Sequence, residues 1–399
     1  MTPGGGPHRH WRLVPPAAAV PLLAAAVLAL GGCESMRFNP LDWFTRSKPP
    51  PPAPLAEIRD PVPVRVLWQA GVGRGRDAAF SPVAAGDAVF AAAADGQVTR
   101  LDAATGRQVW QVRLPSALAG GVGSDGKLVV VGSIEGEVIA LDADGRVVWR
   151  ARVSSEVLAP PVVEGDLVVV RSADSRIFAL DARDGRRRWL YQRAAPALGV
   201  RSAAGVVVRS GFVFAGFSGG KLVALSVANG GLRWEGTVSV PKGTTELERV
   251  TDVIGLPWVG ERETCAVAFQ GRVACFDLGN GNQVWARDMS SSSGLGVDGR
   301  AVFVSEDRGA VSALERTTGR SLWRQDRLTN RNLSAPLPLG TDVAVGDLQG
   351  YVHFLARDTG AFVARTATDG SPIRSAPVPF GKGFLVQTTG GTVVALAVR

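Results

Sequence analysis

The feature that most constrains this chain is a unit that returns eight times between residue 64 and the C-terminus. In every copy, the last residue of a turn is followed five positions later by a large apolar residue. The pairs are Gly96/Leu101, Gly136/Leu141, Ser175/Leu180, Gly220/Leu225, Gly271/Phe276, Gly309/Leu314, Gly350/Leu355 and Gly391/Leu396. A spacing kept through eight copies indicates eight structural units of one kind.

A second anchor, a glycine followed four residues later by tryptophan, occurs in six of the copies. These pairs are Gly106/Trp110, Gly145/Trp149, Gly185/Trp189, Gly230/Trp234, Gly281/Trp285 and Gly319/Trp323, whereas Gly360 is followed by Ala364. The tryptophans recur at roughly 40 to 50 residues, which is typical of a four-stranded propeller blade. We interpret each tryptophan as a wedge between blades and turns such as Asp95-Gly96 as two-residue hairpins.

The sequence therefore predicts an all-β chain folded as an eight-bladed β-propeller of four-stranded antiparallel blades over residues 64–399. Runs such as Val129 to Val131 suit strands buried on both faces, and blades of this kind must stack because a lone sheet leaves its faces bare. The eighth copy, from Ser375 to Arg399, has material for three strands only. We expect Val64 to Trp68 to supply the fourth, so that the last blade is closed by the N-terminal strand.

The N-terminus predicts export and a membrane anchor. His8, Arg9 and Arg12 precede an apolar stretch from Val14 to Leu30, as in a secretory signal. Prolines leave too short an apolar run for a membrane-spanning helix. The end of the stretch, Leu30-Gly31-Gly32-Cys33, resembles the bacterial lipobox, which implies a signal peptide over residues 1–32 and fatty acyl chains, palmitate among them, on Cys33. Glu34 follows Cys33 where the inner-membrane retention signal has Asp, which favours the outer membrane.

Residues 33–63 read as the lipid anchor followed by a Pro-rich linker. The run Pro49 to Pro52 and the polar residues around it cannot form a core. Polyproline is stiff, so we expect a spacer of roughly 3 Å per residue between membrane and propeller.

Charge and histidine content exclude several function classes. The net charge is +8, but the basic residues are spread along the chain without a dense run, which argues against a nucleic-acid partner. Beyond the N-terminus the chain has a single histidine, His353, so His-based metal sites and Ser/His/Asp catalysis lack their parts. We expect His353 to be a half-buried strand residue, and we predict no catalytic residues and no metal.

Cys265 and Cys275 flank the turn at Gln270-Gly271. A two-residue turn would place them on opposite faces of the sheet, which favours two buried thiols. A bulge would instead bring them together as a disulfide, which an oxidising compartment permits.

The phrase Ala-Leu-Asp-Ala-x-x-Gly-x-x-x-Trp at residues 179–189 resembles the repeat of pyrroloquinoline-quinone-type propellers. Quinoprotein dehydrogenases and the BamB family of outer-membrane assembly lipoproteins share this repeat. The dehydrogenases carry adjacent cysteines and a calcium cluster, and this chain has neither adjacent cysteines nor a convincing cluster of calcium ligands. The aspartates that recur at one repeat position, Asp102, Asp142, Asp181 and Asp277, suit turns. We therefore expect no cofactor and no enzymatic activity.

Segments outside the generic repeat, residues 243–253 and 350–364 with the lost tryptophan, resemble the BamB family. The resemblance implies a scaffold lipoprotein on the periplasmic face of the outer membrane, a monomer within a hetero-oligomer. Its implied partners are the periplasmic domains of BamA and other subunits of the BAM complex, and its implied role is to assist insertion of β-barrel proteins. Binding of unfolded outer-membrane proteins stays open, as do a quinoprotein dehydrogenase and another periplasmic propeller binding protein as alternatives.

In that family, loops between the third and fifth blades dock onto BamA. Carried over by resemblance, the partner-binding residues here are Leu198, Val200, Arg201 and Asp252. Ile254 departs from the family pattern, which has a carboxylate there. The alternative is that Arg201 and Asp252 only stabilise each other's loops, because exposed ion pairs contribute little energy.

Overall fold

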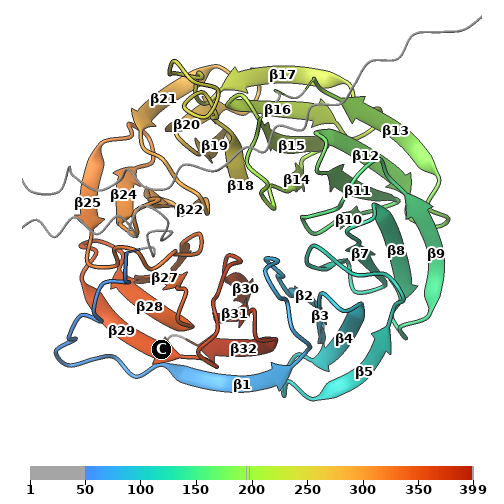
Figure 1. Ribbon diagram of the computed structural model, residues 1–399, viewed down its shortest axis with the longest axis horizontal. Coiled ribbons are helices and arrows are strands. Elements are labelled where there is room, and N and C mark those ends of the chain that lie inside the picture. Colours follow the sequence, from blue (N-terminus) through green and yellow to red (C-terminus); the bar gives the residue numbers. More distant parts are fainter. Residues whose placement is uncertain (1–49, 195, 197, 398–399) are drawn as a thin grey trace, which may run out of the picture. The chain divides into compact units, whose positions relative to one another are not determined.

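The computed structural model describes residues 50–194, 196 and 198–397, and within them all regular structure is β-strand. The strands form eight four-stranded antiparallel sheets that stand around a central axis as the blades of a propeller (Figure 1). This confirms the predicted fold class. The predicted signal peptide, Cys33 and the first part of the linker lie outside the described residues. The described part of the chain has no helix suited to crossing a membrane.

The blades follow one another along the chain, and each has its strands in sequence order except the last. Blades one to four are β2 (Val83–Ala85), β3 (Ala88–Ala92), β4 (Gln97–Asp102) and β5 (Gln108–Arg113); β6 (Gly123–Ser124), β7 (Leu128–Gly132), β8 (Glu137–Asp142) and β9 (Val147–Arg152); β10 (Val162–Glu164), β11 (Leu167–Ser172), β12 (Arg176–Asp181) and β13 (Arg187–Gln192); β14 (Val206–Arg209), β15 (Phe212–Phe217), β16 (Lys221–Ser226) and β17 (Leu232–Thr237). Blades five to seven are β18 (Val253–Val259), β19 (Glu263–Ala268), β20 (Arg272–Asp277) and β21 (Gln283–Asp288); β22 (Leu295–Val297), β23 (Ala301–Ser305), β24 (Val311–Glu315) and β25 (Ser321–Gln325); β26 (Leu337–Leu339), β27 (Asp342–Gly346), β28 (Tyr351–Ala356) and β29 (Phe362–Ala367).

Blade eight joins the two ends of the ring. It consists of β30 (Val378–Phe380), β31 (Gly383–Gln387) and β32 (Thr392–Ala397), with β1 (Arg65–Gly71) paired antiparallel to β32. Arg65 stands opposite Ala397, so the N-terminal strand is the outer strand of the C-terminal blade. The predicted closure is confirmed.

The turns between the second and third strands hold three residues, so the expectation of two-residue hairpins was wrong. In blade one, Ala92 pairs with Val98, and Ala93 N–H donates to Gln97 O (2.9 Å). The loop is therefore Ala94 to Gly96, and Gly96 has a φ of 90°. The last residue of a three-residue loop has the left-handed backbone conformation, and glycine adopts this conformation without a steric penalty.

The glycine and tryptophan anchors meet across neighbouring blades. Trp149 of blade two donates its Nε1–H to Ala182 O of blade three (2.8 Å), and its ring lies against Gly185 of blade three, where a Cβ would come within 2.6 Å of the ring. The same Nε1–H···O bond joins Trp68 to Ala103, Trp110 to Ala143, Trp189 to Val227, Trp234 to Leu278, Trp285 to Arg316 and Trp323 to Arg357. The predicted wedge between blades is confirmed, and each glycine is the surface on which the preceding wedge rests.

This pairing explains why blade seven has Ala364 in place of tryptophan. A tryptophan there would need a glycine turn between the third and fourth strands of blade eight. Those strands are β32 and β1, which come from opposite ends of the chain and share no turn. Instead, Val62 N–H donates to Val363 O (2.9 Å), and Val62 and Val64 pack against the apolar cluster that contains Ala364.

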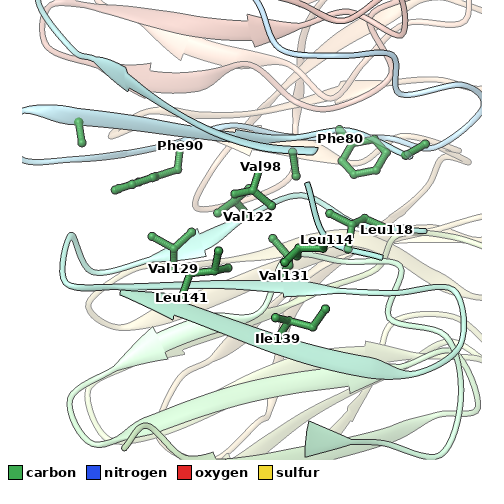
Figure 2. Close-up of a cluster of buried hydrophobic side chains, with 13 residues drawn as sticks. Phe80, Phe90, Val98, Leu114, Leu118, Val122, Val129, Val131, Ile139 and Leu141 are labelled. Atoms are coloured by element: carbon green, nitrogen blue, oxygen red, sulfur yellow. The ribbon is translucent and has the colours of Figure 1, made fainter. Parts of the chain in front are cut away.

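The core lies between the blades. Phe90 and Val98 of blade one face Val129, Val131 and other apolar residues of blade two across a layer with no solvent access (Figure 2). The free energy gained by removing apolar surface from water is roughly proportional to the area buried. Each sheet is therefore stabilised by its neighbours on both sides.

Cys265 and Cys275 form a disulfide, which corrects the expectation of two thiols. The turn between them holds Phe269 to Gly271, with Gln270 at a φ of 46°. Because this loop has three residues instead of two, Cys265 pairs directly with Cys275, and both side chains lie on one face of the sheet.

The last part of the predicted linker lies against blade seven and the loop before it, which differs from the free spacer expected over all of residues 33–63. Ala53 N–H donates to Thr329 O (2.9 Å), and the Arg331 Nε–H donates to Ala53 O (3.0 Å). Nearby, Arg365 Nη2 donates to Ala56 O (2.9 Å). Backbone groups of this segment are therefore hydrogen-bonded to the propeller.

His353 is completely buried beneath this segment, not half-buried as expected. Its Nε2 lies 2.8 Å from Asp347 Oδ2, and its Nδ1 accepts a hydrogen bond from Arg365 Nε (3.1 Å). Since Nδ1 is an acceptor, the ring is neutral with its proton on Nε2. Burial lowers the pKa of His353 and outweighs the opposing effect of Asp347.

Candidate partner-binding site

The residues carried over as a partner-binding set lie on the connections that enter and leave blade four. The connection between β13 and β14 carries Leu198 and Val200, which are 44% and 37% exposed. Gly199, which joins them, and Val200 line a cavity together with Asp252. Leu198 and Val200 therefore form the apolar part of the candidate site.

Asp252 anchors this loop from beneath. It is buried, and its carboxylate accepts hydrogen bonds from Val200 N–H (2.5 Å) and Gly219 N–H (3.3 Å). Gly199 crosses directly above the carboxylate, because a Cβ at this position would lie 3.0 Å from Asp252 Oδ2. Asp252 thus sets the position of Leu198 and Val200 and has little surface of its own for a partner.

Arg201 lies at the exposed edge of the same loop. Its guanidinium pairs with Glu156 on the connection between blades two and three, and the side chain remains 67% exposed. The hydrogen bond to Glu156 raises the pKa of Arg201. The structure therefore brings Leu198, Val200 and Asp252 together and directs Arg201 to Glu156. Asp252 holds the loop that carries Arg201, as the alternative supposed, but it does so through Val200 N–H and not through a pair with Arg201.

The departure at Ile254 lies in the core. Ile254 is 2% exposed and packs with Cys265, Val267 and other residues between blades five and six. An apolar residue suits this position, because an unpaired buried carboxylate is strongly unfavourable.

Two residues of this region were missed at the sequence level. Glu156 is one, since nothing in the repeat singles it out. Arg171 is the other, at the end of the apolar strand β11. It lines a cavity of about 250 Å³ together with Gly199, Val200 and Asp252. A charged residue that ends a run of Leu167 and three valines was a signal that could have been noticed.

The cofactor chemistry of quinoprotein dehydrogenases is not matched by these residues. The described cysteines, Cys265 and Cys275, are paired across two strands of blade five and are not adjacent in sequence. Within the described residues, no group of three or more His, Cys, Asp or Glu side chains could hold a metal ion. Asp102 accepts from Thr105 N–H (2.9 Å) and Asp142 from Arg146 N–H (2.8 Å), which places the recurring aspartates in turns, as expected.

Comparisons with known proteins show the family and the fold. A family described as "Outer membrane protein assembly factor BamB" matches residues 64–120, 94–325 and 308–399. The outer membrane protein assembly factor BamB of Burkholderia pseudomallei is 43% identical over 377 residues, with 94% of this chain and 97% of that protein covered. The factor of the same name from Bordetella pertussis is 44% identical over 389 residues, with 97% of both chains covered.

Solved structures show the same fold. The crystal structure of BamB from Moraxella catarrhalis superposes with a TM-score of 0.78 at 28% identity, covering 84% of this chain and all of the other. A quinohemoprotein alcohol dehydrogenase from Comamonas testosteroni reaches a TM-score of 0.65 at 14% identity, covering 84% of this chain and 76% of the enzyme. At that identity the likeness extends to the propeller fold alone.

Proposed function

Because this chain belongs to the family of the outer membrane protein assembly factor BamB, we propose that it is a non-enzymatic scaffold that binds the periplasmic domains of BamA. In this role it assists insertion of β-barrel proteins as part of the BAM complex, alongside the other subunits. The observation that supports the proposal is the loop on which Leu198 and Val200 are held in solvent by the buried Asp252.

The proposal includes attachment to the periplasmic face of the outer membrane through lipid on Cys33, after cleavage of a signal peptide over residues 1–32. Several acyl chains at about 0.8 kcal/mol per buried CH₂ hold a protein on a membrane essentially permanently. We expect Cys33→Ser to move the protein from the membrane fraction to the soluble fraction. Retention in the membrane would reject the lipid anchor.

The proposed contact combines an apolar pair with a cation. Leu198 and Val200 would bury their exposed surface against BamA, while Arg201 offers a planar guanidinium that can form two parallel hydrogen bonds to a carboxylate. Arginine is among the residue types enriched in the few contacts that carry most of the binding energy of an interface. On binding, Arg201 would release Glu156 and pair with a carboxylate of BamA, so that its charge is paired both before and after binding.

A charge reversal tests the cation. Arg201→Glu should lower capture of BamA periplasmic domains at least tenfold, because it places two carboxylates side by side at the edge of the site. The matched control is Arg113→Glu, since Arg113 pairs with Asp95 in blade one at nearly the same exposure, 66% against 67%. Equal capture by both variants would reject this surface as the docking site.

A second pair of variants tests the apolar part. Leu198→Asp should weaken capture of BamA, whereas Leu232→Asp, on an exposed outer strand of blade four, should not. Melting temperatures of both variants should stay near that of the parent, because both side chains are exposed. Loss of capture in the Leu232 variant as well would indicate a nonspecific effect of surface charge.

A further inference from the structure

The eight blades can be compared at one position, four residues before the end of the turn between the second and third strands. In seven blades this residue pairs with the second residue of the third strand, and in blade six Ser305 pairs with the first residue, Val311. In blade three the residue is Arg171, opposite Ile177. The other blades hold uncharged residues there: Ala92, Gly132, Gly216, Val267, Ser305, Gly346 and Gln387. Blade three alone places a cation at this position.

In several blades the same position is sealed by an apolar side chain from the connection to the next blade. A Cβ on Gly132 would lie 2.3 Å from Val157, and a Cβ on Gly346 would lie 2.4 Å from Ile373. In blade three the following connection is the loop of Leu198 to Arg201. The space beside Arg171 is a cavity of about 250 Å³, which is more than enough for a small group.

The guanidinium of Arg171 is only partly used by the protein. One face stacks on the ring of Phe217, with the central carbon 4.8 Å from the ring centre. Its Nη1 is buried and has no hydrogen-bond partner. Native proteins satisfy nearly all buried polar groups, and an unpaired charged donor is more costly than a neutral one. A ligand that accepts hydrogen bonds would remove this cost.

The other charges that line the cavity are already occupied. Asp252 accepts from two backbone N–H groups, and Arg201 is paired with Glu156 at the edge. Burial lowers the pKa of Arg171 to about 10, against the opposing effect of Asp252, so the group is charged at neutral pH. Among the described residues that line the cavity, Arg171 is therefore the one charged residue with an unpaired hydrogen-bond donor. It could bind one anionic acceptor.

We propose that this cavity is a binding site for a carboxylate of a peptide, with Arg171 as the residue that fixes it. A carboxylate is planar and can accept two hydrogen bonds from the free edge of a guanidinium. The exposed Leu198 and Val200 beside the cavity favour a carboxylate carried on a polypeptide over a free ion. The site does not depend on BamA as the partner, and its test uses no BamA.

Three hexapeptides of one apolar sequence, titrated into the full chain by calorimetry, test the proposal and the source of the carboxylate. The first has an internal Glu and an amidated C-terminus, the second has Gln and a free C-terminus, and the third has Gln and an amidated C-terminus. We expect the first or the second to bind at least tenfold more tightly than the third, since charge-assisted hydrogen bonds commonly contribute that much. Equal binding of all three, or no binding, would overturn the proposal.

Variants then assign the effect to Arg171. Arg171→Met should weaken binding of the carboxylate peptide about tenfold or more and leave the neutral peptide unchanged. The matched control is Arg187→Met, which removes an exposed cation from the outer strand of the same blade. Unchanged binding of the carboxylate peptide to the Arg171 variant would refute the site. Displacement of the bound peptide by inorganic phosphate, but not by other peptides with a carboxylate, would also refute it.

A direct reading on the unaltered protein protects the test against misfolding of the variant. With ¹⁵N-labelled arginine, the Nε–H resonance of Arg171 should shift on addition of the carboxylate peptide and stay in place with the neutral one. If the Arg171 Nε–H resonance shifts with neither peptide, the proposal is contradicted.

Discussion

Two arginines with a buried guanidinium nitrogen, Arg331 before blade seven and Arg171 in blade three, have opposite surroundings. Arg331 is 2% exposed, donates from Nη1 to Asp347 (2.5 Å) and from Nε to Ala53 O (3.0 Å). Asp347 in turn is bonded to His353 and to two backbone N–H groups. Arg171 has a buried Nη1 with no acceptor and a cavity beside it.

The difference teaches that burial of a charge does not by itself indicate a binding site. The network around Arg331 is completed by the chain's own N-terminal segment, so its role is structural. The surroundings of Arg171 are incomplete, so an acceptor from another molecule is needed to complete them. Unfilled hydrogen-bonding capacity separates the two regions.

The largest expected effect comes from breaking the complete network. Arg331→Met should lower the free energy of unfolding by about 3–5 kcal/mol, because it leaves the buried Asp347 without its cation. Denaturant unfolding followed by tryptophan fluorescence measures this. A loss below about 1 kcal/mol would show that the two regions do not differ as described.

Removing the docked segment should have a smaller effect. A chain that starts at Glu57 lacks Ala53 O and Ala56 O, the acceptors for Arg331 and Arg365. We expect a loss of roughly 1–3 kcal/mol, since water can reach the freed donors. The control is a chain that starts at Pro50. Equal stability of the two chains would mean that the segment contributes nothing to the network.

The pH dependence around His353 sharpens the comparison further. The pKa of His353 is lowered in the folded state, so the unfolded chain binds a proton first as pH falls below about 6.5. The contribution of His353 to the free energy of unfolding should be fully present above that pH, and the free energy of unfolding should fall by about 1 kcal/mol toward pH 5.5. His353→Gln should flatten this part of the profile, and a profile identical to that of the parent would contradict the assignment.

The smallest effect is expected at the incomplete site. Arg171→Met should change the free energy of unfolding by less than about 1 kcal/mol, because no hydrogen bond of Nη1 is lost and a flexible apolar side chain can fill the space. Thermal unfolding beside the Arg331 variant measures the contrast. A loss as large as that of Arg331→Met would make Arg171 a structural residue.

Nearly all of the fold could be predicted from the sequence repeat. Gly145 and Trp149 return at fixed spacing because each must meet a neighbour of identical shape, so the eight blades and their closure by β1 could be predicted. The coupling of Gly185 to Trp149 could not, because it joins residues of different copies. Its physical origin is contact between blades, which spacing within one blade does not reveal.

What was missed depends on details of one or two residues. One added residue in the turn before Gly271 reversed the expected faces of Cys265 and Cys275. The docking of Ala53 on blade seven depends on contacts between segments far apart in sequence, which no local pattern encodes. Arg171 could have been found by aligning the eight copies, since its position four residues before Ser175 is uncharged in every other copy.

The pairing of β1 with β32 has a consequence for how the molecule comes into being. Seven blades are each made from one continuous stretch of chain. The strand from Arg65 to Gly71 has no partner until Thr392 to Ala397 arrive. Joining the two ends closes a very long loop and carries the corresponding entropy cost. A polypeptide that ends before Thr392 would therefore have an exposed strand at its beginning and no complete ring.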